Sequence, residues 1–203
     1  MRPASHVQNG RSLRHYGPQA VGRDRLERFT AAHYARHYGA RLGDFYPHLL
    51  SLDNGAGLQA CMGFRGAGHG ALFLEQYLDE PIEALVREHL GIAAPRAGIV
   101  EVGGLAADWQ GAGRRLILAA AGWLHSRGYR VVVFTATPCV ANSFRRLRLL
   151  PVDLGAADPR RLRRNASDWG CYYDHHPRVF AGPIRAALET TPRSPAERGA
   201  SAC

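Results

Sequence analysis

Residues 97–137 constrain the fold more than any other part of the chain, because strand and helix patterns alternate there. Ala97–Ala106 predicts a strand, Gly111–Arg127 predicts a helix that ends at Gly128, and Tyr129–Thr137, which is rich in valine, predicts a buried strand. A helix that connects two consecutive strands favours parallel pairing between them. The segment therefore predicts an α/β protein with a parallel strand pair.

The flanking sequence predicts one domain over residues 21–188, because no composition shift or internal repeat divides it. The elements expected there are a helix over Arg23–Tyr38, a hairpin of Phe45–Leu52 and Leu58–Arg65, a helix with Pro81 in its first turn and Asp79 or Glu80 as its cap, a short helix over Asn142–Leu150, and short strands over Val152–Ile184. Residues 1–20 lack periodicity and predict a flexible arm. Residues 189–203 are rich in Pro, Ser, Ala and Gly and predict a disordered tail.

Charge and composition limit the classes of binding partner that are expected. The net charge is +9, and all 26 basic residues are arginine. Arginine pairs with carboxylates and phosphates, so an anionic partner is expected, although a compositional bias toward arginine explains the excess equally well. The arginines are spread along the chain, which argues against nucleic-acid binding. No secretory signal and no apolar run of about 20 residues are evident, so a cytoplasmic protein without stable membrane insertion is expected.

The Gly103-Gly104 pair predicts a bulge at which the strand separates from a neighbour. The loop that follows opens a helix, whose first amides are unpaired and partly positive, and Arg114 and Arg115 add full charges there. We therefore expect a pyrophosphate site, the alternative being a turn that binds nothing. The candidate binding residues are Val102, Gly103, Gly104, Leu105, Gln110, Gly111, Ala112, Gly113, Arg114 and Arg115.

This arrangement resembles the acyl-CoA-binding core of the GNAT N-acyltransferase superfamily. Its loop pattern is Gln/Arg-x-x-Gly-x-Gly/Ala, which Gln110 and Gly113 match and in which Arg115 replaces the final small residue. The runs LFLEQYLDEPIE, VEVGGLA, VVVFTAT, NSFRRLRLLPV and WGCYYDHHP resemble the thermostable hemolysin family more closely, over about Phe29–Ile184. The resemblance implies a GNAT-like fold, a mixed twisted sheet flanked by helices, and acyl-CoA or an acyl-phosphopantetheine thioester as co-substrate.

The resemblance also implies residue roles. Glu101 would be the general base, with the alternative that it pairs with an arginine, and Glu75 would bind the acceptor amine or assist the base. The N–H of Gly104 or Leu105 would donate to the thioester oxygen. Tyr172 or Tyr173 would protonate the leaving thiolate, unless these rings are simply packed in a strand. Asn142 would contact the pantetheine arm or cap its helix.

Three functions fit these observations. The first is an N-acyltransferase that moves an acyl group from acyl-CoA or an acidic acyl-carrier protein to an amine or amino acid. The second is a membrane-active lytic protein, as the family name implies, with lysis caused directly or by a detergent-like product. The third is a GNAT-shaped binding module without catalysis, which Arg115 favours. No metal is expected, and a homodimer is left open.

Overall fold

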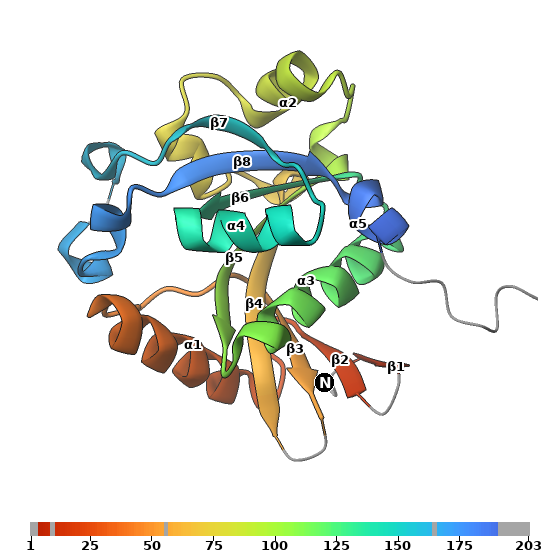
Figure 1. The fold of residues 1–203 in the computed structure, drawn as a ribbon, viewed down its shortest axis with the longest axis vertical. Helices are drawn as coiled ribbons and strands as arrows, with labels where there is room; N and C mark the ends of the chain where they lie inside the picture. The colour runs from red at the N-terminus through yellow and green to blue at the C-terminus, as the bar shows by residue number, and fades with distance from the viewer. Residues whose placement is uncertain (1–3, 9–10, 55–56, 164–165, 191–203) are drawn as a thin grey trace, which may run out of the picture.

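The computed structural model describes residues 4–8, 11–54, 57–163 and 166–190. Within these residues, eight strands form one sheet in the order β1-β2-β3-β4-β5-β6-β8-β7 (Figure 1). The strands are β1 (Ala4–Gln8), β2 (Arg11–Tyr16), β3 (His48–Asp53), β4 (Leu58–Gly66), β5 (Ile99–Ala107), β6 (Val131–Ala136), β7 (Val152–Ala156) and β8 (Arg178–Pro183). Neighbours pair antiparallel except β5 and β6, which pair parallel across the helix between them. The expected mixed α/β sheet and its parallel pair are confirmed.

Helices cover both faces of this sheet. They are α1 (Arg23–Tyr38), α2 (Ile82–Leu90), α3 (Gln110–His125), α4 (Pro138–Arg146) and α5 (Ile184–Thr190). Residues of α3, α4 and α5 pack on the face that carries Val100 and Val102. Residues of α2 pack on the opposite face beside Ile99, and α1 packs on that same face farther along, against β3 and β4.

The N-terminal segment differs from the flexible arm that the sequence predicts. β2 pairs antiparallel with β3, and Leu13 and Tyr16 of β2 are buried. The ring of His15 lies 4.9 Å from that of Trp123 in α3. Because this strand mixes arginine and histidine with few apolar residues, its buried face is supplied by distant partners that no local pattern reveals. The expected tail over 191–203 lies outside the described residues.

Three local expectations are corrected. α4 begins at Pro138, four residues before Asn142, because proline fits the first turn of a helix. Asn142 is therefore inside the helix and is not its cap. Pro81 occupies the N-cap position of α2 in place of Asp79 or Glu80.

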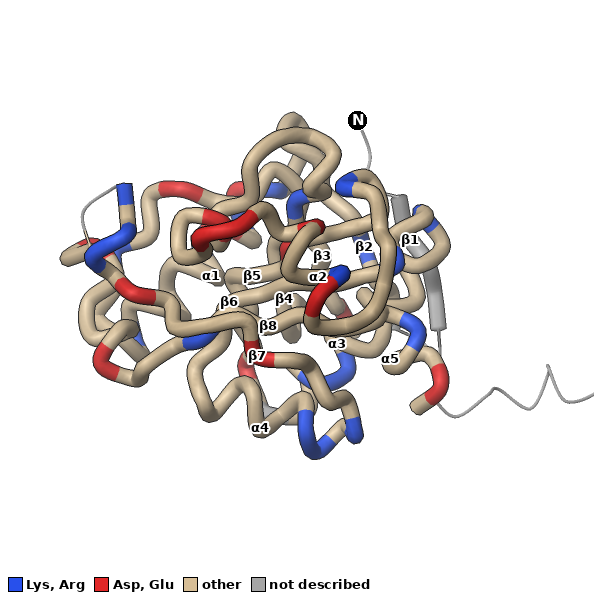
Figure 2. The backbone as a smooth tube through the Cα atoms, turned by 90° about the horizontal axis from the view of Figure 1, so that it is seen from above, with Lys and Arg blue, Asp and Glu red and all other residues tan. Residues whose placement is uncertain are grey.

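Arginines lie on several separate parts of the surface (Figure 2). Three of them, Arg145, Arg146 and Arg148, are exposed at the end of α4, beside the exposed Leu150. Val140 and Phe144 of the same helix line one of the cavities described below.

The burial of β2 can be tested with Leu13→Ala. A buried leucine truncated to alanine costs about 2 to 3 kcal/mol, whereas a residue in a flexible arm costs almost nothing. We expect that loss in the free energy of unfolding, measured by urea titration. Val21→Ala is the control, because Val21 is 78% exposed and should leave stability unchanged. A Leu13→Ala protein as stable as wild type would contradict the placement of β2.

Candidate active site

The parallel pair β5–β6 separates partway along its length. Its ladder runs from Ile99 opposite Val131 to Val102 opposite Phe134, and beyond this point β5 continues only along β4, while β6 continues only along β8. The β4–β5 register shifts here as well, so that Gly104 has no partner residue on either neighbour, and its φ of 60° is a conformation that glycine adopts at little cost. The predicted bulge is present, and it opens the sheet.

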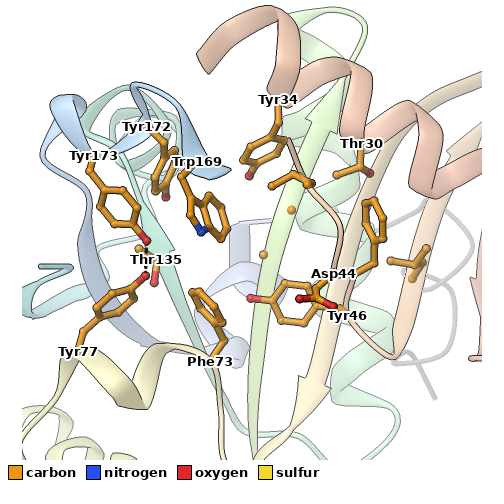
Figure 3. A pocket seen from close by; sticks show the side chains of 16 residues that line it. Thr30, Tyr34, Asp44, Tyr46, Phe73, Tyr77, Thr135, Trp169, Tyr172 and Tyr173 are labelled. Carbon is orange, nitrogen blue, oxygen red and sulfur yellow. Dashed lines mark hydrogen bonds between the residues drawn. The ribbon is translucent and has the colours of Figure 1, made fainter. Parts of the chain in front are cut away.

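Two adjoining cavities lie at this split. The first, which we call the aromatic cavity, has Tyr34, Tyr46, Phe73, Tyr77, Trp169 and Tyr173 among its lining residues (Figure 3). The second, which we call the helix-side cavity, has Met62, Val102, Leu105, Ile117, Val140 and Phe144 among its own. Both are lined by Tyr34, Gly103, Gly104, Thr135 and Tyr172.

Two glycines leave room for the Tyr46 ring to pack on the sheet. Gly63 on β4 and Gly103 on β5 are register partners. A Cβ at Gly63 would lie 2.5 Å from the Tyr46 Cβ, and one at Gly103 would lie 2.5 Å from its hydroxyl oxygen. The two missing side chains therefore leave room for the ring to lie flat on the sheet, and its hydroxyl donates to Glu101 Oε1 at 3.2 Å.

Glu101 is a buried carboxylate, 1% exposed, beneath the aromatic cavity. The N–H of Phe73 donates to Oε2 at 2.7 Å, and the N–H of Leu74 donates to Oε1 at 3.0 Å. Burial raises the pKa of Glu101 to about 7, against the opposing effect of these hydrogen bonds and of the one from Tyr46. None of the ion pairs among the described residues involves Glu101.

Glu101 itself lines neither cavity; Tyr46 and Phe73, both in contact with its carboxylate, line the aromatic one. A proton can thus reach Glu101 from the cavity through the Tyr46 hydroxyl. Sequence reasoning selected Glu101 but missed Tyr46. The available signal was the two glycines in adjacent strands, which leave space for an aromatic ring.

Glu75 has a different environment. The Arg96 guanidinium donates to both its oxygens, at 2.6 and 2.9 Å, and the N–H groups of Leu72 and Ile82 donate at 2.8 and 3.3 Å. Burial alone would raise the pKa of Glu75, but the Arg96 hydrogen bonds and these amides lower it below the ordinary value. Glu75 lines neither cavity, and its contacts tie α2 to the segments before β5 and after β4. These contacts fix its carboxylate between segments, and its expected role toward the acceptor amine stays a prediction.

The two expected tyrosines lie in a 3-10 turn, Tyr172–His175, and not in a strand. Tyr172 lines both cavities, and the hydroxyl of Tyr173 shares a 2.6 Å hydrogen bond with that of Tyr77 (Figure 3). Burial raises the pKa of Tyr173 to about 12 and that of Tyr172 well above its ordinary value. Both hydroxyls therefore stay protonated near neutral pH and can donate hydrogen bonds.

The start of α3 is covered by an aromatic ring. A Cβ at Gly111 would lie 1.8 Å from the Trp109 ring, and the Arg115 guanidinium lies 5.1 Å from the centre of that ring. Ala112 and Gly113 are buried, Arg114 is half-buried and Arg115 is exposed. The side chain of Gln110 lies outside the described residues.

Of the expected binding residues, Val102, Gly103, Gly104 and Leu105 line one or both cavities, whereas those from Gly111 to Arg115 line neither. Asn142 is exposed, and its Oδ1 accepts from Arg145 at 3.0 Å. Asn142 lines neither cavity, so its expected contact with a pantetheine arm stays a prediction.

The described residues offer neither a metal site nor a membrane span. They contain no group of three or more His, Cys, Asp or Glu side chains placed to hold a metal ion. None of their helices combines the length and the apolar character that crossing a membrane requires.

Comparison with known proteins adds a family and a fold. The chain matches the thermostable hemolysin family over residues 16–188. Its structure is similar to that of TofI in an apo form (15% identity, 91% of this chain and 98% of that chain, TM-score 0.58). It is also similar to FeeM, an N-acyl amino acid synthase from uncultured soil microbes (19%, 90% and 96%, 0.57), and to the AHL synthase LasI (13%, 89% and 91%, 0.53). At these identities the similarity concerns the fold, which is GNAT-like as expected. No curated protein matches the sequence significantly.

The packing of Tyr46 against the two glycines can be tested with Gly63→Ala. The added methyl group overlaps the base of the Tyr46 side chain, and overpacking of this kind costs about 1–3 kcal/mol. We expect that loss in urea unfolding. Gly122→Ala in α3 is the matched control, because its Cβ would meet only Leu188 at 3.9 Å. Alanine in a helix interior is about 0.5–1 kcal/mol better than glycine. Equal changes in the free energy of unfolding for the two substitutions would contradict this packing of Tyr46.

Proposed function

The chain belongs to the thermostable hemolysin family, and we propose that it is an N-acyltransferase that moves an acyl group from a thioester to an amine or amino acid. One observation carries the proposal: two cavities meet at a split between parallel strands, beside a buried carboxylate with a pKa of about 7 that a tyrosine hydroxyl connects to the cavity. Such a carboxylate is suited to accept a proton near neutral pH.

The helix-side cavity is the proposed site of the thioester arm. Its apolar side chains from β5, α3 and α4 suit an acyl chain, and polar groups from α1, among them His33 and Tyr38, suit the amides of a pantetheine arm. The amides of Gly104 or Leu105, at the register shift, are the proposed donors to the thioester carbonyl. The half-buried Arg114 and the exposed Arg115 would attract phosphate at the start of α3.

The aromatic cavity is the proposed site of the acceptor. The neutral amine nitrogen attacks the thioester carbon and loses a proton to the Tyr46 oxygen, as the Tyr46 proton passes to Glu101 Oε1. The carbon–sulfur bond then breaks, and the thiolate leaves and takes up a proton from water. Tyr172 or Tyr173 would stabilise that thiolate by a hydrogen bond, since burial raises the pKa of both phenols and each can donate without giving up its proton.

An acidic acyl-carrier protein is the proposed donor partner, with acyl-CoA as the alternative. The net charge of +9 supports an acidic partner. The exposed arginines at the end of α4 lie on the helix whose Val140 and Phe144 line the helix-side cavity. A carrier docked there would present its arm directly to that cavity.

The direct test is thiol release from a panel of acyl-CoA and acyl-carrier thioesters with amines and amino acids, followed by mass spectrometry of the products. We expect kcat/KM to rise with pH through about 7, because Glu101 must be ionised to accept the proton. Glu101→Gln should lower kcat by about 10²–10⁴-fold and remove this limb of the profile. Thioester binding without thiol release would instead indicate a binding module. An unchanged pH profile in Glu101→Gln would exclude Glu101 as the base.

The relay is tested separately by Tyr46→Phe. Phenylalanine keeps the ring packed against Gly63 and Gly103 and removes the hydroxyl between the cavity and Glu101. We expect kcat to fall by about 10²-fold or more, with little change in the affinity for the thioester. Tyr16→Phe is the control, because Tyr16 lines neither cavity. A Tyr46→Phe enzyme that retains full activity would show that the proton takes another path.

A further inference from the structure

Thr135 carries a buried hydroxyl without a partner. Its Oγ1 is inaccessible to solvent, and no hydrogen-bonding group of the described residues reaches it. Buried hydroxyls in folded proteins are nearly always paired, so an orphan in a cavity wall indicates that a ligand atom completes its hydrogen bonding.

Thr135 lies directly at the point where β5 and β6 separate. It is the first residue of β6 beyond the last β5–β6 pair, Val102 opposite Phe134, and on its other side it still pairs with Val179 of β8. The backbone of β6 is thus held firmly at this point while the side facing β5 is open. The hydroxyl is carried on a rigid strand, which favours accurate placement of a hydrogen bond.

Thr135 also lies where the two cavities join, since it lines both. Figure 3 shows its side chain near the hydroxyls of Tyr77 and Tyr173, which are bonded to each other. By strand alternation it shares a face with Val131 and Val133, which are buried in the apolar cluster of that face. The methyl group of Thr135 continues that apolar surface, whereas its hydroxyl has no role in the packing.

We propose that the Thr135 hydroxyl donates a hydrogen bond to the carbonyl oxygen of the bound thioester. This inference rests on the proposed function and adds a second donor, from β6, to the amides of Gly104 or Leu105 on β5. As the amine attacks, the carbonyl oxygen gains negative charge, and donors on both arms of the split stabilise it. When the carbon–sulfur bond breaks, the charge leaves with the sulfur. Thr135 neither gains nor loses a proton.

Thr135→Val tests the hydroxyl with nearly the same shape. We expect kcat to fall about 10- to 100-fold, while Thr135→Ser, which keeps the hydroxyl, stays within a few-fold of wild type. Because the orphan hydroxyl stabilises nothing in the free protein, Thr135→Val should keep or raise the melting temperature. Thr137→Val is the stability control: the Thr137 hydroxyl bonds with Tyr38, so its loss should lower that temperature.

Two unreactive ligands separate this inference from the proposed function. An S-(2-oxoalkyl)-CoA retains a carbonyl close to the thioester position, whereas an S-alkyl-CoA of equal length lacks it. We expect Thr135→Val to weaken calorimetric binding of the first several-fold and to leave the second unchanged.

Four outcomes would count against the inference. Equal effects on both ligands, or a Thr135→Val enzyme with wild-type kcat, would overturn the role of Thr135 and leave acyl transfer intact. A fall in melting temperature as large as that of Thr137→Val would show that the hydroxyl is structural. A wild-type protein that binds neither ligand and releases no thiol would overturn the proposed function together with this inference.

Discussion

The arrangement of the site depends on a single buried carboxylate. A charge at the position of Glu101 is costly in a low-dielectric interior. The cost is met by two main-chain N–H groups, from Phe73 and Leu74, and by the Tyr46 hydroxyl. These contacts bring two segments that are distant in sequence to one point on β5. The same burial that destabilises the charged carboxylate also raises its pKa into the range where it can exchange protons.

Two glutamates of this protein illustrate how environment assigns a role. Glu75 lies beside Arg96 and two amides, and its pKa is lowered, so it stays charged and serves as a tie between segments. Glu101 lies away from any ion pair of the described region, and its pKa is raised. Both follow short apolar runs in the sequence, and only their neighbours in space distinguish them.

The split between β5 and β6 gives the fold its opening. Glycines at the register shift end the ladder, and the separated strands leave room for two cavities that share a wall. The aromatic cavity carries tyrosine hydroxyls, and the helix-side cavity combines aliphatic side chains with further aromatic and hydroxyl groups. A reaction that joins an acceptor to an acyl chain needs two adjoining sites, which supports the proposed acceptor and donor sides.

The sequence by itself determined the local elements and the family. Helical periodicity with a glycine end defined Arg23–Tyr38, valine-rich strands flanking a helix defined the parallel pair, and Gly103-Gly104 located the bulge. Tertiary structure alone decided that Arg11–Tyr16 joins the sheet, that Glu75 pairs with Arg96, and that Tyr46 reaches Glu101 across 55 residues. Local patterns record backbone propensity and one buried face, whereas a pKa or a hydrogen bond depends on groups that folding brings together from distant parts of the chain.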